Sequence, residues 1–111
     1  MATRFGLSED DIARLYGVFE RYSKIDQVLL YGSRAKGNYR PGSDIDLTLM
    51  GEIDWPTFNQ LTTELDDLLL PYQIDLSIYQ HIDNDELKAH IQRHGQVLYA
   101  RPESRKPEAE S

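Results

Sequence analysis

The sequence predicts an α/β domain, a small mixed β-sheet backed by helices. Three short segments, residues 26–31, 44–50 and 72–79, are apolar or alternating and are bounded by turn residues, as is typical of strands. Segments with helical periodicity and capping residues precede, separate and follow them. At 111 residues the chain suffices for one hydrophobic core, and it is too short to include a second, substrate-binding domain.

The first helix is predicted to begin after Ser8, whose hydroxyl can cap it, while Leu7 can pack against Ile12 across the first turn. Its apolar residues have the spacing i, i+3, i+4, i+7 and are Ile12, Leu15, Tyr16 and Phe19. Residues 26–31 (DQVLLY) are too few for a helix. We expect them to form a central strand with both faces covered, ending at Gly32.

A turn-rich segment separates this strand from the next. Residues 33–36 can form one or two helical turns, closed by Gly37, whose missing Cβ suits a left-handed cap. Residues 38–43 contain Asn, Pro and Gly and are predicted to be a loop. Residues 44–50 follow as the second strand.

The second long helix is predicted to begin at Asp54, with Pro56 tolerated in its first turn, and to end before Pro71. Its apolar stripe is expected to consist of Phe58, Leu61, Leu65, Leu68 and Leu69. Residues 72–79 then form the third strand, which alternates between an apolar and a polar face.

The last helix is predicted over about residues 84–94. Asp83 and Glu86 form a capping pair at its start, and Gly95 is its C-cap. Residues 96–99 can add a short edge strand.

Composition restricts the function further. The chain carries 19 acidic and 12 basic residues, a formal charge of −7, which argues against direct, nonspecific binding to nucleic acid because such binding needs a basic surface. The absence of cysteine excludes disulfides and a cysteine nucleophile. No segment has the length and apolar character of a signal peptide or a membrane span, so we expect a cytoplasmic protein. We expect one domain over residues 1–100 and a disordered tail over residues 101–111.

Two carboxylates lie close together on the second strand. Asp44 and Asp46 are separated by one residue, so their side chains emerge on the same face, roughly 7 Å apart at the backbone. Carboxylates held side by side repel each other, and this cost is usually offset by a cation. Magnesium takes one or two carboxylates together with substrate phosphates. Asp75, on the polar face of the third strand, is the candidate third ligand of a two-metal site.

The turn after the first strand is suited to phosphate. Gly32 lets a phosphate approach the backbone closely, and the Ser33 hydroxyl and the amides that follow can donate to phosphate oxygens. Arg34 and Lys36 can neutralise further phosphate charge, Arg34 in a bidentate manner. Such parts suit phosphoryl and nucleotidyl transfer, which depend mainly on positioning and charge stabilisation.

Each motif also has an ordinary structural interpretation. Most Gly-Ser dipeptides are simple turns, Asp-x-Asp on a strand is often an exposed face, and Asp75 could pair with a basic side chain. The ordered combination of strand, Gly-Ser turn, basic turn, Asp-x-Asp strand, helix and Asp-bearing strand favours the functional interpretation.

In this order the motifs resemble the signature of the minimal nucleotidyltransferase (MNT) family in the DNA polymerase β superfamily. The matching segments are residues 32–37 (GSRAKG), residues 43–47 (SDIDL) and Asp75, within a similarity that covers about residues 8–100. Lys36 stands where arginine is common, which removes a fork geometry and keeps the charge.

The resemblance implies a polymerase-β-like nucleotidyltransferase fold, with ATP as substrate and two Mg²⁺ ions. It implies that Asp44 and Asp46 bind both metals, that Asp75 is the third carboxylate and assists the nucleophile, and that Gly32 and Ser33 hold the triphosphate.

The resemblance also implies a partner. Stand-alone MNT proteins are often MntA-like antitoxins that transfer AMP from ATP to a tyrosine of a HEPN-domain ribonuclease toxin, and we expect such a toxin as the partner in a hetero-oligomer. Two alternatives remain open: an antitoxin that acts by binding and occlusion without catalysis, and nucleotidyl transfer to a small molecule or RNA.

Four aromatic residues outside the motif could have further roles. His90 and His94 have the i, i+4 spacing of a zinc pair, although a surface helix near its C-terminus explains them better. Trp55 could stack on a base or anchor a partner, and core or staple packing is the favoured alternative. Tyr39, in the loop beside the predicted site, is a candidate ligand or modification contact.

Overall fold

A four-stranded mixed sheet organises the molecule, and the computed structural model describes residues 3–37 and 44–101. The strand order is β5-β4-β3-β6, with β3 (Ile25–Tyr31), β4 (Ile45–Gly51), β5 (Ile74–Ile78) and β6 (Gln96–Ala100). β3 pairs antiparallel with both β4 and β6, whereas β4 and β5 are parallel. The predicted succession of strands and helices along the chain is confirmed, including the terminal edge strand.

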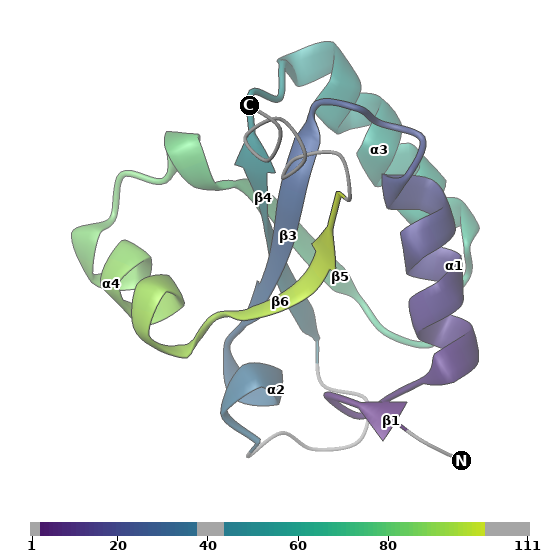
Figure 1. The fold of residues 1–111 in the computed structure, drawn as a ribbon, viewed down its shortest axis with the longest axis horizontal. Coiled ribbons are helices and arrows are strands. Elements are labelled where there is room, and N and C mark those ends of the chain that lie inside the picture. Colours follow the sequence, from purple (N-terminus) through teal and green to yellow (C-terminus); the bar gives the residue numbers. More distant parts are fainter. Residues whose placement is uncertain (1–2, 38–43, 102–111) are drawn as a thin grey trace, which may run out of the picture.

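Helices cover the sheet unequally (Figure 1). α1 (Glu9–Phe19) and α3 (Trp55–Asp67) lie on one side, and α4 (Asp85–His94) lies on the other. The four-residue α2 (Ser33–Lys36) directly follows β3. The third strand is shorter than predicted: it begins two residues later, at Ile74, and it ends one residue earlier because residues 79–81 form a 3₁₀ turn (η1, Tyr79–His81).

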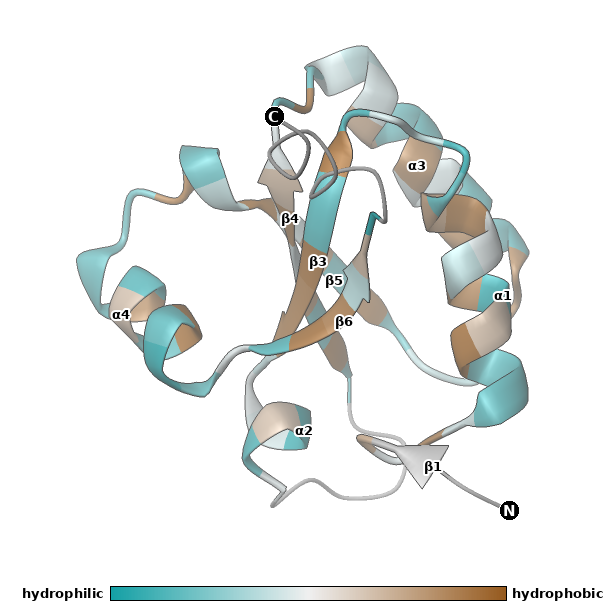
Figure 2. Ribbon diagram, in the orientation of Figure 1, coloured by the Kyte–Doolittle hydropathy of each residue, from teal (hydrophilic) through white to brown (hydrophobic). Residues whose placement is uncertain are grey.

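The hydrophobic core lies mainly between the sheet and the α1/α3 layer, where apolar positions of the helices and strands face one another (Figure 2). Fully buried side chains include Leu15, Phe19, Leu30, Leu47, Leu49, Leu61 and Leu98. Such a core fixes the register of β3 against β4, since a slip of one residue would turn every buried side chain of a strand to the opposite face.

Most predicted helix ends are confirmed. Ser8 caps α1 by accepting a hydrogen bond from the Asp11 amide, and Gly37 closes α2 in the left-handed conformation. At α4 the prediction was wrong in one residue. The cap is Asn84, whose side chain accepts from the Leu87 amide, and not Asp83. Gly95 follows α4 with an extended backbone, and it must be small because a Cβ there would lie 2.4 Å from the Ile91 carbonyl oxygen.

Two local features differ from the sequence-based expectation. α3 ends at Asp67, so Leu69 lies beyond the helix at a φ of 56° and is 84% exposed, and its predicted place in the apolar stripe was wrong. A two-stranded hairpin of β1 (Thr3–Arg4) and β2 (Leu7–Ser8) precedes α1 and was not predicted, because each strand is only two residues long.

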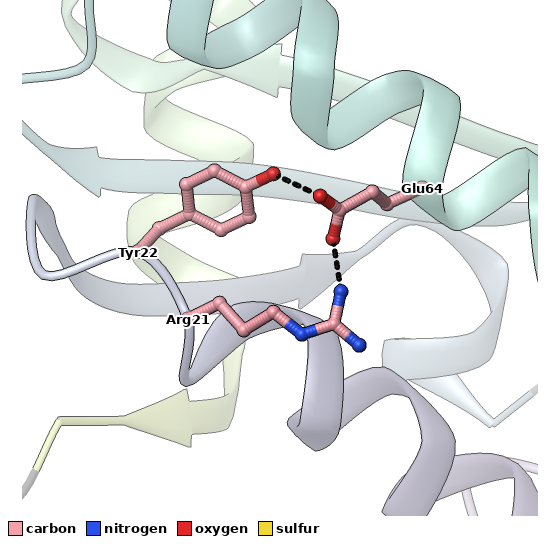
Figure 3. A network of polar contacts seen from close by, with 3 residues as sticks. All are labelled: Arg21, Tyr22 and Glu64. Carbon is pink, nitrogen blue, oxygen red and sulfur yellow. Dashed lines mark hydrogen bonds and ion pairs between the residues drawn. The ribbon is translucent and has the colours of Figure 1, made fainter.

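Side-chain hydrogen bonds connect the residues after α1 to α3, and the residue after β6 to the start of β3. Arg21 and Tyr22, just after α1, both hydrogen bond to the Glu64 carboxylate on α3 (Figure 3). Arg101 was expected in the tail, yet its side chain bonds the Ile25 carbonyl and the Asp26 carboxylate at the start of β3. Residues 102–111 of the predicted tail lie outside the described residues.

Among the helices of the described residues, none is long and apolar enough to cross a membrane.

Candidate active site

Three neighbouring strands bring the predicted residues to one row. Tyr31, the last residue of β3, is paired with Asp46 on β4, and Asp46 is paired with Asp75 on β5. Paired residues of adjacent strands point to the same face of a sheet. Asp44, two residues before Asp46, shares that face and is exposed. The register of β4 and β5 therefore places Asp46 beside Asp75, and Asp44, just before the start of β4, acts electrostatically on Asp46. These three aspartates, the aspartate row, lie beside the turn at the end of β3.

Gly32 brings that turn against the carboxylates. Its φ of 80° and ψ of −155° belong to a region that is essentially restricted to glycine. A Cβ at this position would lie 2.3 Å from the Asp46 Oδ2, so only glycine leaves the carboxylate room. The backbone of the turn and the Asp46 side chain are thus in direct contact.

Asp46 has the electrostatics expected of an ion-binding carboxylate. Partial burial raises its pKa, and the negative charges of Asp75 and Asp44 raise it further. In residues 3–37 and 44–101, none of the three aspartates is in an ion pair, so no basic side chain of these residues holds Asp75. The negative charge of this row is therefore not neutralised by the described part of the chain.

The aspartate row fits magnesium chemically. It offers only hard oxygen ligands, it concentrates negative charge, and its members are half-buried or exposed, so substrate phosphates and water can complete the coordination. As the side chains lie, no three His, Cys, Asp or Glu residues of the described segments converge tightly enough to hold an ion. Asp44, Asp46 and Asp75 would therefore have to rotate toward a metal.

Tyr31 borders the row on the β3 side. Its phenol is buried, and burial raises its pKa; a hydrogen bond to Ser77 acts in the opposite direction, and the charges of Asp46 and Asp75 reinforce the rise. The Tyr31 phenol therefore stays protonated, and an uncharged side chain lies beside the carboxylates.

The predicted phosphate-binding side chains differ in their exposure to solvent. Ser33 begins α2 beside Gly32 and is partly exposed, and Lys36 is exposed at its end. Arg34 departs from the prediction because it is 3% exposed, its Nη1 donates to the Phe5 carbonyl at 2.7 Å, and its guanidinium lies 4.8 Å from the centre of the Tyr72 ring. Direct contact between Arg34 and a phosphate would require it to leave these partners.

His90 on α4 also reaches the turn, which sequence reasoning missed. Its Nε2 accepts a hydrogen bond from the Gly32 amide at 3.2 Å, and its ring contacts those of Tyr31 and His94. The i, i+4 spacing of His90 and His94 was noticed only as a zinc pattern, and among the described residues no third ligand completes such a site.

The two other aromatic candidates have different outcomes. Trp55 is 55% exposed, so it does not pack in the core, but its ring contacts that of Phe58 in the first turn of α3, as staple packing would, and that of His81. Tyr39 lies outside the described residues.

Comparisons with known proteins identify the family and the fold. The family model described as "Polymerase beta, Nucleotidyltransferase" matches residues 14–104. A curated relative from Methanocaldococcus jannaschii, named "Putative protein adenylyltransferase", is 29% identical over 85 residues, which cover 68% of this chain and 80% of the relative.

Solved structures show the same fold. A toxin–antitoxin complex with AMP-PNP matches with a TM-score of 0.66 and 18% identity, over 85% of this chain and 77% of that chain. A tri-AMPylated Shewanella oneidensis HEPN toxin in complex with MNT antitoxin matches with a TM-score of 0.57 and 19% identity, over 86% of this chain and 72% of that chain. The matched family model spans most of the sequence and includes the aspartate row, and the chain therefore belongs to the polymerase beta nucleotidyltransferase family.

Proposed function

We propose that this nucleotidyltransferase transfers AMP from ATP to a tyrosine of a HEPN-domain toxin, with magnesium as cofactor, and acts as the antitoxin of the pair in a cytoplasmic hetero-oligomer. The observation that carries the proposal is the contact between Gly32 and Asp46. It supports the proposal because the turn that we expect to bind phosphate lies directly beside a carboxylate paired with Asp75 on the next strand.

In this proposal the chain's residues hold and orient the nucleotide. The Ser33 hydroxyl and the backbone after Gly32 bind phosphate oxygens, and Lys36 neutralises part of their charge. Asp44, Asp46 and Asp75 would hold two magnesium ions, which supply charge neutralisation at the phosphates and alignment of the attacking and leaving oxygens.

The reaction is an in-line displacement at the α-phosphorus. The acceptor hydroxyl oxygen forms the new bond to phosphorus, the bond to the bridging oxygen breaks, and pyrophosphate leaves. Asp75 lies at the exposed edge of the aspartate row, where it can accept the proton of an incoming hydroxyl.

Three observations support the choice of ATP and of a protein acceptor. The curated relative is named for protein adenylyltransferase activity, one structural relative is a toxin–antitoxin complex with AMP-PNP, and another is a complex with an AMPylated HEPN toxin. The charge of −7 favours a partner protein over nonspecific contact with nucleic acid.

Intact-mass analysis of both chains tests the proposal after incubation of the protein with ATP, magnesium and a HEPN toxin encoded beside it. We expect the toxin mass to increase by one or more AMP units, and Asp46→Asn to abolish the increase. Asp66→Asn is the matched control, because Asp66 is exposed on α3, away from the aspartate row. A toxin that is silenced in a stable complex without any mass increase would contradict catalysis and favour occlusion.

A further inference from the structure

His90 connects α4 to the Gly32-Ser33 turn. α4 is held on the sheet by the buried Ile91, and the next residue toward its start, His90, directs its imidazole to the end of β3. The Gly32 amide donates to Nε2 at 3.2 Å, and the ring meets that of Tyr31 edge-on with 6.1 Å between centroids. The imidazole therefore contacts both residues that flank the 31–32 peptide bond.

This hydrogen bond fixes the orientation of a peptide on which the site depends. Gly32 lies in a sparsely populated backbone region, and such conformations persist only where the surroundings hold them. Its amide is held by His90 on one side, while its Cα borders the Asp46 carboxylate on the other. A rotation of this peptide would move the turn that precedes Ser33 and relax its contact with Asp46.

The charge around His90 favours the form that can accept this bond. Partial burial lowers the pKa of the imidazole, and the neighbouring basic side chains of His94, Lys36 and Arg93 lower it further. A neutral imidazole with its proton on Nδ1 leaves Nε2 free to accept from Gly32.

We propose that His90 is a positioning residue of the nucleotide site: its Nε2 holds the Gly32 amide and thereby orients the Gly32-Ser33 turn for the triphosphate. This inference rests on the proposed function, because it concerns the same turn. It differs from a zinc site, in which the imidazole nitrogen would bind metal and could not accept the Gly32 hydrogen bond.

Two substitutions separate the hydrogen bond from the ring contact. His90→Phe keeps an aromatic ring against Tyr31 and removes the acceptor, whereas His90→Gln removes the ring and restores an acceptor oxygen near the position of Nε2. His94→Phe is the control, because it places the same change one turn along α4, on a residue that contacts His90 and not Gly32.

The first measurement is calorimetric binding of AMP-PNP with magnesium to the isolated protein, well below the melting temperature of every variant. We expect His90→Phe to weaken binding about tenfold, as the loss of one hydrogen bond predicts, and His90→Gln to recover most of this loss. His94→Phe should bind like the wild type. In the transfer assay with the toxin, His90→Phe should raise KM for ATP by a larger factor than it lowers kcat, because the lost hydrogen bond orients the turn that binds the triphosphate and the three aspartates themselves are retained.

The outcomes are distinguishable. If the wild type binds AMP-PNP and His90→Phe binds it equally well, the role of His90 is refuted and the proposed function stands. If His90→Phe lowers only the melting temperature, the residue is merely structural and the inference is refuted. If the wild type itself does not bind AMP-PNP with magnesium, the proposed function fails and the inference fails with it.

Discussion

Replacement of Gly32 by alanine should damage the active site and the stability of the fold through separable causes. The backbone conformation of Gly32, φ 80° and ψ −155°, costs about 1–3 kcal/mol for a residue with a Cβ. The new Cβ would also lie 2.3 Å from the Asp46 Oδ2, where ordinary contacts begin at 3.4 Å. The carboxylate or the turn must therefore move by about 1 Å, and a misplacement of this size costs roughly 100-fold in rate.

Two other glycines provide controls for Gly32→Ala. Gly37 has a φ of 88°, and a Cβ added to it would meet no atom within 4 Å, so Gly37→Ala imposes backbone strain without a collision. Gly51, at the far end of β4, would collide with the Lys24 carbonyl oxygen at 2.3 Å, so Gly51→Ala destabilises the fold away from the aspartate row. Each 1 kcal/mol lowers the melting temperature of a domain of this size by about 4–8 °C.

The assay combines thermal melting with AMP transfer measured well below the lowest melting temperature. All three variants should melt below the wild type, and only Gly32→Ala should lose about 100-fold in kcat/KM. If Gly32→Ala transfers AMP with the kcat/KM of the wild type, the importance of the contact between Gly32 and Asp46 is refuted. An equal loss of transfer in Gly51→Ala would show that reduced stability, and not the position of the carboxylate, explains the effect.

Four further predictions follow from individual contacts. Asp46→Asn should raise the melting temperature at pH 7, because burial and neighbouring charges raise the pKa of the Asp46 carboxyl in the folded protein. The difference in melting temperature between the variant and the wild type should vanish below the ordinary pKa of 3.8, where the carboxyl is protonated in both the folded and the unfolded state. Melting curves recorded across this pH range test the prediction. Ser8→Ala should cost about 1 kcal/mol in a denaturant titration without change in transfer, because it removes only the cap of α1. Burial and the hydrogen bond to Glu64 raise the pKa of Tyr22 to about 12. The contribution of the protonated Tyr22 to folding stability should therefore be complete below pH 10 and be lost as the pH rises through 12. Glu64→Ala should lower the titration midpoint of Tyr22 in a spectrophotometric titration. Magnesium with AMP-PNP at about 100 times its Kd should stabilise the wild type by about 2.7 kcal/mol in thermal melting, and Asp44→Ala should remove that rise; an unchanged wild-type melting temperature would contradict the metal site.

Local signals explain what could be predicted from the sequence. The Ser8 cap, the left-handed Gly37 and the strand β4 depend on neighbouring residues, and each was found where it was expected. The aspartate row could also be anticipated, since the i, i+2 spacing of Asp44 and Asp46 places both on one face of a strand. That Asp75 lies directly beside Asp46 depends on the pairing of β4 with β5, which the sequence pattern alone does not specify.

Long-range contacts explain the remaining differences. Arg34 was expected at the phosphates, but its partners, Phe5 and Tyr72, are distant in sequence and bury it. His90 was interpreted as a helix-surface residue because nothing near it in sequence indicates that its imidazole faces Gly32. Both cases are side chains whose partners are set by tertiary packing, and periodicity does not report such partners.

Nucleotidyl transfer at the Gly32-Asp46 contact is tested most directly by label transfer from ATP. The purified protein, magnesium and the HEPN toxin are incubated with ATP carrying radioactive phosphorus at either the α- or the γ-position, and the protein chains are then separated. We predict that the α-label alone appears on the toxin and that Asp46→Asn abolishes it. Transfer of the γ-label would identify a phosphoryl transferase, and the absence of both labels from a toxin that is nevertheless silenced would contradict catalysis at this site.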